Sequence, residues 1–186
     1  MKINLIIAFL FCLSASVNYK VDDKSSVVIK GTSTLHDWEM KTSNVSGTAN
    51  FELDNTEISG IKSLTISVPS ESLKSDKSAM DKNAYKALKT SDHKNINFKM
   101  TKINRFEKVG DDYRITCDGT LEIAGSSKPT VVIAMCSLLN TGVVHCTGEK
   151  TIKMSEYKVE APSFMFGSVK TGDEITIVFD VNLNKI

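Results

Sequence analysis

A regular alternation of apolar and polar residues runs through residues 174–184, near the C-terminus. Its apolar members are Ile175, Ile177, Phe179, Val181 and Leu183. Because successive side chains of a β-strand point to opposite faces, this spacing predicts a strand with one apolar face. The same period recurs in shorter runs at 64–68, 96–100, 113–117 and 121–123. Most of the chain therefore reads as strands that bury one of their two faces.

Turn residues separate these runs at short, even intervals. Gly110-Asp111-Asp112 and Thr171-Gly172-Asp173 are two of them, because Gly and Asp favour the backbone conformations that tight turns require. Strands joined by connections of hairpin length predict an antiparallel all-β barrel or sandwich. The run 130–139 is apolar on both faces, which predicts a strand more enclosed than the others.

One segment, 78–89, departs from the two-residue period. Met80, Ala84 and Leu88 recur at a spacing of four, with Tyr85 beside them. Residues spaced in this way share one face of a helix. The segment predicts one short helix within a series of strands, placed where it can cap one mouth of a barrel.

The first sixteen residues have the pattern of a secretory signal peptide. Lys2 precedes an apolar run that ends at Leu13, and the small residues Ser14-Ala15-Ser16 follow. The run is shorter than the roughly 20 residues of a membrane-spanning helix. We expect cleavage after Ser16, which leaves a single mature domain at 17–186. Lipidation at Cys12 is the alternative, and the bulky residue before that cysteine disfavours it.

Three cysteines remain in the mature chain: Cys117, Cys136 and Cys146. An exported protein meets an oxidising compartment, so a disulfide is expected. The turn Asn140-Thr141-Gly142 would fold a hairpin that sets Cys136 opposite Cys146. A Cys117–Cys136 bridge and three free thiols are the alternatives, and the sequence leaves all three open.

Charge and motifs argue against several classes of function. Lys and Arg number 23 against 22 Asp and Glu, so no basic excess favours nucleic acid. His36, His93 and His145 lie too far apart for a local metal site, and His36 and Asp37 would point to opposite faces of a strand. Neither a G-x-S-x-G elbow, a phosphate-binding glycine loop nor a C-x-x-C pair occurs. We therefore predict a protein that is not an enzyme and uses no metal or cofactor.

Several segments, taken in order, resemble one family. They are Gly31-Thr32-Ser33-Thr34-Leu35-His36-Asp37-Trp38, Gly119-Thr120-Leu121-Glu122-Ile123-Ala124-Gly125, Met154-Ser155-Glu156-Tyr157 and 167–177. Together they resemble the YceI-like family of periplasmic polyisoprenoid-binding proteins, in a variant of Bacteroidetes type. The resemblance implies an eight-stranded antiparallel lipocalin-like barrel in the periplasm. It also implies a lumen that takes the apolar tail of a quinone or a polyprenyl lipid.

The expected ligand site is the set of inward faces of this barrel. From the strands it comprises Phe51, Leu64, Ile66, Val68, Ile96, Phe98, Met100, Ile115, Leu121, Ile177 and Phe179. Met80, Tyr85 and Leu88 of the helix and Phe164 and Phe166 of an apolar loop would cover a mouth. The expected partner is an isoprenoid lipid or quinone, with room for transient membrane contact and for a homodimer.

A different class of function is the main alternative. The chain could be a non-catalytic structural or stress-response protein that acts through the outer surface of its barrel. A lumen filled by side chains, without a cavity of at least about 300 Å³, would favour that alternative.

Overall fold

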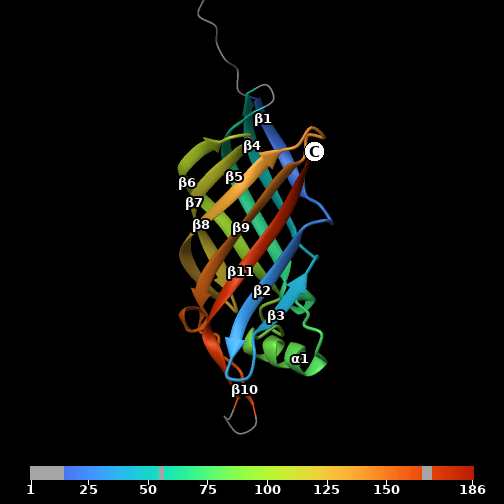
Figure 1. Ribbon diagram of the computed structural model, residues 1–186, viewed down its shortest axis with the longest axis vertical. Coiled ribbons are helices and arrows are strands. Elements are labelled where there is room, and N and C mark those ends of the chain that lie inside the picture. The colour runs from blue at the N-terminus through green and yellow to red at the C-terminus, as the bar shows by residue number, and fades with distance from the viewer. Residues whose placement is uncertain (1–14, 55–56, 165–168) are drawn as a thin grey trace, which may run out of the picture.

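The computed structural model describes residues 15–54, 57–164 and 169–186 as an elongated barrel (Figure 1). Its strands are β1 (Ala15–Val21), β2 (Ser26–Ser33), β3 (Trp38–Thr42), β4 (Ser46–Asp54), β5 (Glu57–Pro69), β6 (Asn95–Val109), β7 (Asp112–Ile123), β8 (Ser126–Leu138), β9 (Val144–Lys153), β10 (Ser163–Phe164) and β11 (Val169–Lys185). Its helical elements are the 3-10 turns η1 (Ser70–Ser72) and η2 (Met154–Tyr157) and the helix α1 (Ser78–Ala87). Strands dominate the chain, as the two-residue period predicts.

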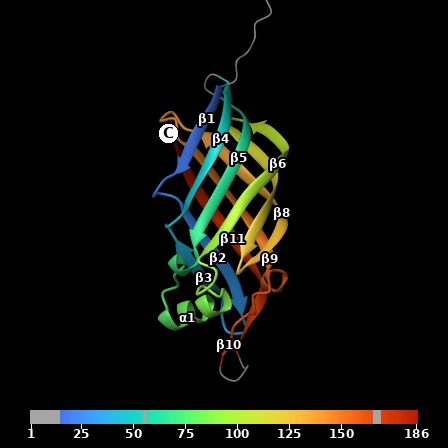
Figure 2. The same cartoon turned by 180° about the vertical axis from the view of Figure 1, so that it is seen from behind.

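Eight of the described strands close into a ring. Its order is β1-β4-β5-β6-β7-β8-β9-β11, and β11 pairs again with β1. Every pairing is antiparallel, and Figures 1 and 2 show the strands tilted around the long axis. Closure pairs strand edges that would otherwise be exposed. The predicted eight-stranded antiparallel barrel is confirmed.

The long strand β11 pairs with two different strands along the same edge. Tyr19–Val21 of β1 pair with its last residues, Leu183–Lys185. Nearer its start, β11 pairs with β2, and β2 in turn pairs with β3. β2 and β3 therefore extend the wall beyond the point where β1 ends.

One end of the barrel is packed solid; we call it the packed end. Tyr19, Phe51, Ile58, Val144 and Leu183 are each at most 2 % exposed there. The Tyr19 and Phe51 rings meet edge to face with centroids 5.3 Å apart, a favoured arrangement of two aromatic rings. These residues belong to strands that meet near β1 and the C-terminus (Figure 1).

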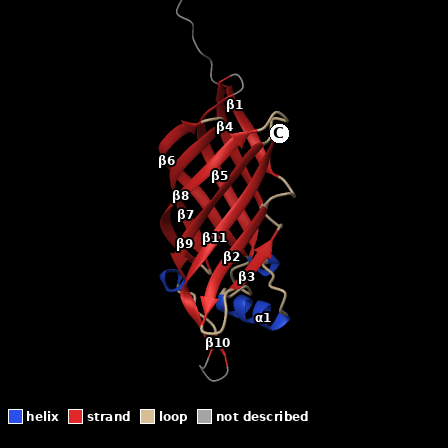
Figure 3. Ribbon diagram, in the orientation of Figure 1, coloured by secondary structure: helices blue, strands red, loops and turns tan. Residues whose placement is uncertain are grey.

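Helix α1 lies at the opposite end, which we call the helix end (Figure 3). The predicted helix is confirmed, with its last helical residue at Ala87 rather than Lys89. Lys89 has φ 52°, a left-handed conformation that ends a helix. The rest of the helix-end cover comes from β3 and the segment after β5, where Lys41 and Lys74 exchange backbone hydrogen bonds.

The start of the described chain bears on the predicted signal peptide. Ala15 and Ser16 pair with Leu53 and Glu52 of β4, so cleavage after Ser16 would remove the first two residues of β1. Most of the predicted signal peptide lies outside the described residues, and its cleavage stays a prediction. No described helix is long and apolar enough to cross a membrane.

An apolar cavity as the candidate functional site

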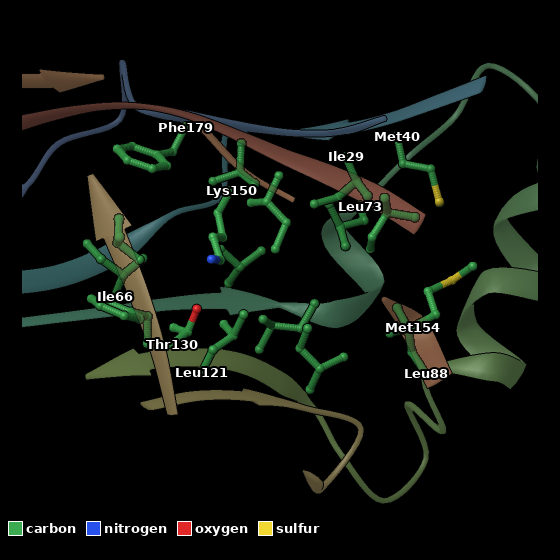
Figure 4. A pocket seen from close by; sticks show the side chains of 18 of the residues that line it. Ile29, Met40, Ile66, Leu73, Leu88, Leu121, Thr130, Lys150, Met154 and Phe179 are labelled. Carbon is green, nitrogen blue, oxygen red and sulfur yellow. The ribbon is translucent and has the colours of Figure 1, made fainter. Parts of the chain in front are cut away.

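The barrel encloses a cavity of about 520 Å³ between its wall and helix α1 (Figure 4). Ligand pockets in proteins commonly have volumes of about 300–1,000 Å³. The lumen is therefore not filled by its own side chains. This hollow is what separates a binding barrel from a purely structural one, so it is the candidate functional site.

Most of the predicted site residues line this cavity. They are Phe51, Leu64, Ile66, Val68, Met80, Leu88, Ile96, Phe98, Met100, Ile115, Leu121, Ile177 and Phe179. The strand residues among them come from the inward phase of their strands, because every second side chain of a barrel strand points inward. The structure thus brings them together around one space, while their role in binding a ligand stays a prediction.

Tyr85 is placed differently from the prediction and does not line the cavity. Its hydroxyl lies 2.9 Å from the carbonyl oxygens of Glu71 and Leu73, and accepts a hydrogen bond from Lys74 Nζ at 2.6 Å. A phenol hydroxyl requires polar partners, and these lie beside the helix rather than beneath it. Tyr85 therefore fastens α1 to the η1 segment. The side chains of Phe164 and Phe166 lie outside the described residues.

Helix α1 is held over the cavity by a buried carboxylate. Asp81 accepts hydrogen bonds from the backbone N–H and the hydroxyl of Ser75, both at 2.7 Å. Burial alone would raise the pKa of Asp81, but the two bonds from Ser75 and the nearby Lys74 charge outweigh it and lower this pKa. The ionised Asp81 thus ties the start of α1 to the preceding loop. Met80 and Ala84 of the same helix line the cavity.

Two glycines in the wall give room to aromatic rings. Gly119 of β7 faces inward, and a Cβ there would collide with the Phe98 ring. Gly148 of β9 stands opposite Phe179 in the register, and a Cβ there would collide with that ring. Each ring lies against the bare backbone of a glycine instead of extending across the lumen. The glycines thereby keep the cavity wide.

The structure also lines the cavity with residues that sequence reasoning missed. They include Ile29, Trp38 and Met40 of β2 and β3, and Val132, Ala134 and Lys150 of β8 and β9. β2 and β3 could not be placed because the sequence does not reveal that β11 has two successive partners. The inward phase of β8 was hidden because the run 130–139 is apolar on both faces.

His36 has a structural place at the mouth. Its Nδ1 lies 2.7 Å from the carbonyl oxygen of Asp37, and no ion pair joins the two described side chains. The Ser33 hydroxyl donates to the His36 carbonyl at 2.8 Å and accepts from its N–H at 3.2 Å. Trp38 Nε1 donates to the Thr32 carbonyl at 3.0 Å. This motif shapes the β2–β3 turn, and no described cluster of His, Cys, Asp or Glu could hold a metal ion.

The three described cysteines form one disulfide and leave one free thiol. Cys136 and Cys146 face each other across β8 and β9 and form a disulfide, with Cα atoms 4.1 Å apart. This is the first of the three predicted arrangements, and it is confirmed. Cys117 is the free cysteine among the described residues. All three line the cavity, and burial raises the pKa of the Cys117 thiol.

Comparison with solved structures identifies the same fold. BcnA from Burkholderia cenocepacia is 18% identical, with a TM-score of 0.69 over 87% of this chain and 98% of that one. A polyisoprenoid-binding domain from Saccharophagus degradans is 11% identical, with a TM-score of 0.71 over 91% and 99%. The YceI protein of Campylobacter jejuni is 22% identical, with a TM-score of 0.56 over 76% and 81%.

Sequence comparison adds the family. No curated protein sequence matches this chain, but the model of the YceI-like domain matches residues 19–183. The match begins in β1 and ends in β11, so it spans the whole ring. The predicted family is confirmed, while the Bacteroidetes-type variant stays a prediction. This chain belongs to the YceI-like family.

Proposed function

We propose that this protein is a periplasmic carrier that holds an isoprenoid lipid, a quinone or a polyprenyl lipid, in its barrel. The observation that carries the proposal is the apolar cavity of about 520 Å³ under α1. The printed name of the Saccharophagus degradans domain, polyisoprenoid binding, supports the ligand class. Binding would be non-covalent, with no chemistry performed on the cargo.

The energetics of such a site follow from its lining. Burying one CH₂ group contributes about 0.8 kcal/mol, so several isoprene units supply a useful affinity without polar contacts. Hydrophobic attraction is non-directional, which suits a flexible chain that adapts to the wall. Met40, Met80 and Met100 in the lining add side chains that adjust readily to an apolar ligand.

Export is part of the same proposal. The signal peptide at 1–16 would direct the chain through the inner membrane and be removed. The Cys136–Cys146 disulfide supports this route, because disulfides persist in oxidising compartments. Transient contact with a membrane, from which cargo would be taken, and a homodimer belong to the proposal too.

The test is to identify what the exported protein carries. Protein purified from the periplasm would be measured by native mass spectrometry, and its organic extract analysed for lipids. We expect one isoprenoid per chain. An empty protein that also fails to take up added phytol, an acyclic isoprenoid alcohol, would contradict the carrier function and favour the structural alternative.

The free thiol in the lumen gives an independent readout of occupancy. Cys117 is 6% exposed and its pKa is raised by burial, so less thiolate forms at neutral pH than on an exposed cysteine. We expect slow alkylation by iodoacetamide that accelerates as the pH rises toward the shifted pKa, and further slowing when phytol is bound. Mass spectrometry of the alkylated protein measures both rates.

The unfolded chain in urea serves as the control, since its thiol should react quickly with or without phytol. Equal rates for the empty and the phytol-treated folded protein would show that phytol does not occupy the lumen beside Cys117.

A further inference from the structure

Lys150 is a cation placed in the apolar wall of the cavity. It occupies the inward phase of β9, two residues after Gly148 and two before Ile152, and it pairs in register with the cavity-lining Ile177 of β11. Figure 4 shows its ammonium group within the pocket, on the side facing Thr130. The Lys150 side chain is only partly exposed. The nearest residues of the same phase, Gly148 and Ile152, and the paired Ile177 carry no polar side chain.

This ammonium has no partner in the described structure. The Lys150 ammonium makes no hydrogen bond or ion pair with any described residue, and no described Asp or Glu lines the cavity. Lys77, at the start of α1, adds a second positive charge to the lining. A charged group that leaves water requires a compensating partner. The described lining is thus positively charged with nothing of its own to balance it.

The wall is interrupted beside Lys150. The ladder between β8 and β9 joins Ala134–Leu138 to Val144–Gly148 and ends there in the described structure. Beyond it, Thr130 and Lys150 line both the cavity and a groove on the outer surface. The charged residues that also line this groove are Lys128, Lys153, Asp118, Glu156 and Glu174, so carboxylates lie in the outer groove but not in the described cavity lining. Lys150 therefore lies where the lumen meets the outside, so a polar group there can keep part of its hydration.

We propose that Lys150 selects an isoprenoid with an anionic head, a phosphate monoester or a carboxylate, over a neutral quinone or alcohol. This inference rests on the proposed carrier function and names its substrate class. The isoprenoid tail of the ligand would occupy the apolar lumen, while its anionic head group pairs with the Lys150 ammonium beside Thr130. A hydrogen bond between charged groups is stronger than one between neutral groups, so the charge of the head decides the affinity.

The experiment compares three ligands that have nearly the same branched isoprenoid tail and differ in the head group. Phytol, phytanic acid and phytyl phosphate would be titrated into the wild-type protein and into Lys150→Met, Lys150→Arg and Lys153→Met. Lys153→Met is the matched control, because Lys153 is an exposed residue of the same strand that lines the outer groove but not the cavity. We expect wild-type protein to bind the two anions about ten-fold or more tighter than phytol. Lys150→Met should lose this preference, and the other two variants should retain it.

The outcomes test the selection of an anionic head group by Lys150 separately from the proposed carrier function. Equal affinity for the three heads, or a preference that survives Lys150→Met, would overturn the anionic selection while phytol binding still supports the carrier. Failure of every ligand to bind would overturn both. Preference for only one of the two anions identifies the head as a phosphate or as a carboxylate. Retained phytol binding by Lys150→Met shows that this variant is folded.

Discussion

Ala134→Trp should reduce isoprenoid binding by at least about ten-fold while the barrel stays folded. Ala134 lines the cavity from β8, where it pairs with Gly148 of β9 at the end of the ladder between these strands. An indole at this position would enter a space of about 520 Å³ and displace several methylene groups of the cargo. Because each buried CH₂ contributes about 0.8 kcal/mol, the loss of two already exceeds ten-fold in affinity. Titration with phytol, followed by tryptophan fluorescence, measures the change.

The next residue supplies the control. Met135 belongs to the outward phase of β8, and Met135→Trp adds the same ring to the outer surface. We expect wild-type affinity from Met135→Trp and a cooperative thermal transition from both variants. If Ala134→Trp bound phytol as tightly as wild type, the cargo would have to lie outside this cavity.

Removal of the disulfide should produce the largest loss of stability. Cys136 and Cys146 are ten residues apart in the sequence, and a bridge that closes so short a loop stabilises a fold by about 2–3 kcal/mol through the unfolded state. Both sulfurs are buried, so we choose Cys136→Ala with Cys146→Ala to avoid burying unpaired hydroxyls. Urea unfolding at equilibrium should show the lower midpoint.

Treatment with a reductant separates the effect of losing the disulfide on stability from the effect of the alanine substitutions themselves. The wild-type midpoint should fall on treatment with dithiothreitol to near that of the double alanine variant, and the variant should not respond. A wild-type midpoint that dithiothreitol leaves unchanged, in protein shown by mass to be reduced, would mean that the bridge does not stabilise the fold.

Sequence periodicity predicted the barrel well because inward and outward side chains alternate along every strand of a closed barrel. An inward residue is followed by an outward one, so Leu64, Ile66 and Val68 could be placed in the lumen without knowledge of the register. The predicted turn at Thr171-Gly172-Asp173 was wrong. Strand β11 continues through it with a shift in register between Thr171 and Ile175, because Gly suits a bulge as well as a turn.

Other predictions failed for a common reason. The alternation of apolar and polar residues does not show which elements pack against a given side chain. The run 130–139 was expected to be enclosed, yet Val131 is 44% and Ile133 52% exposed on the outer surface. Tyr85 was assigned to the cavity by its position in the helix, whereas its hydroxyl is bonded to η1. Lys150 was passed over because a charged residue is not expected in an apolar phase. Only the folded chain reveals that its neighbours leave it unpaired.

The division of the barrel into a packed end and a hollow end separates two kinds of evolutionary change. Substitutions among Tyr19, Ile58 and Val144 act on residues that are at most 2% exposed and do not line the cavity, so they would change the free energy of unfolding first. Substitutions among Met40, Met80 and Leu88, which surround the hollow, would change which molecule fits. One end can therefore diversify its cargo while the other preserves the scaffold, which would let one architecture serve many apolar ligands.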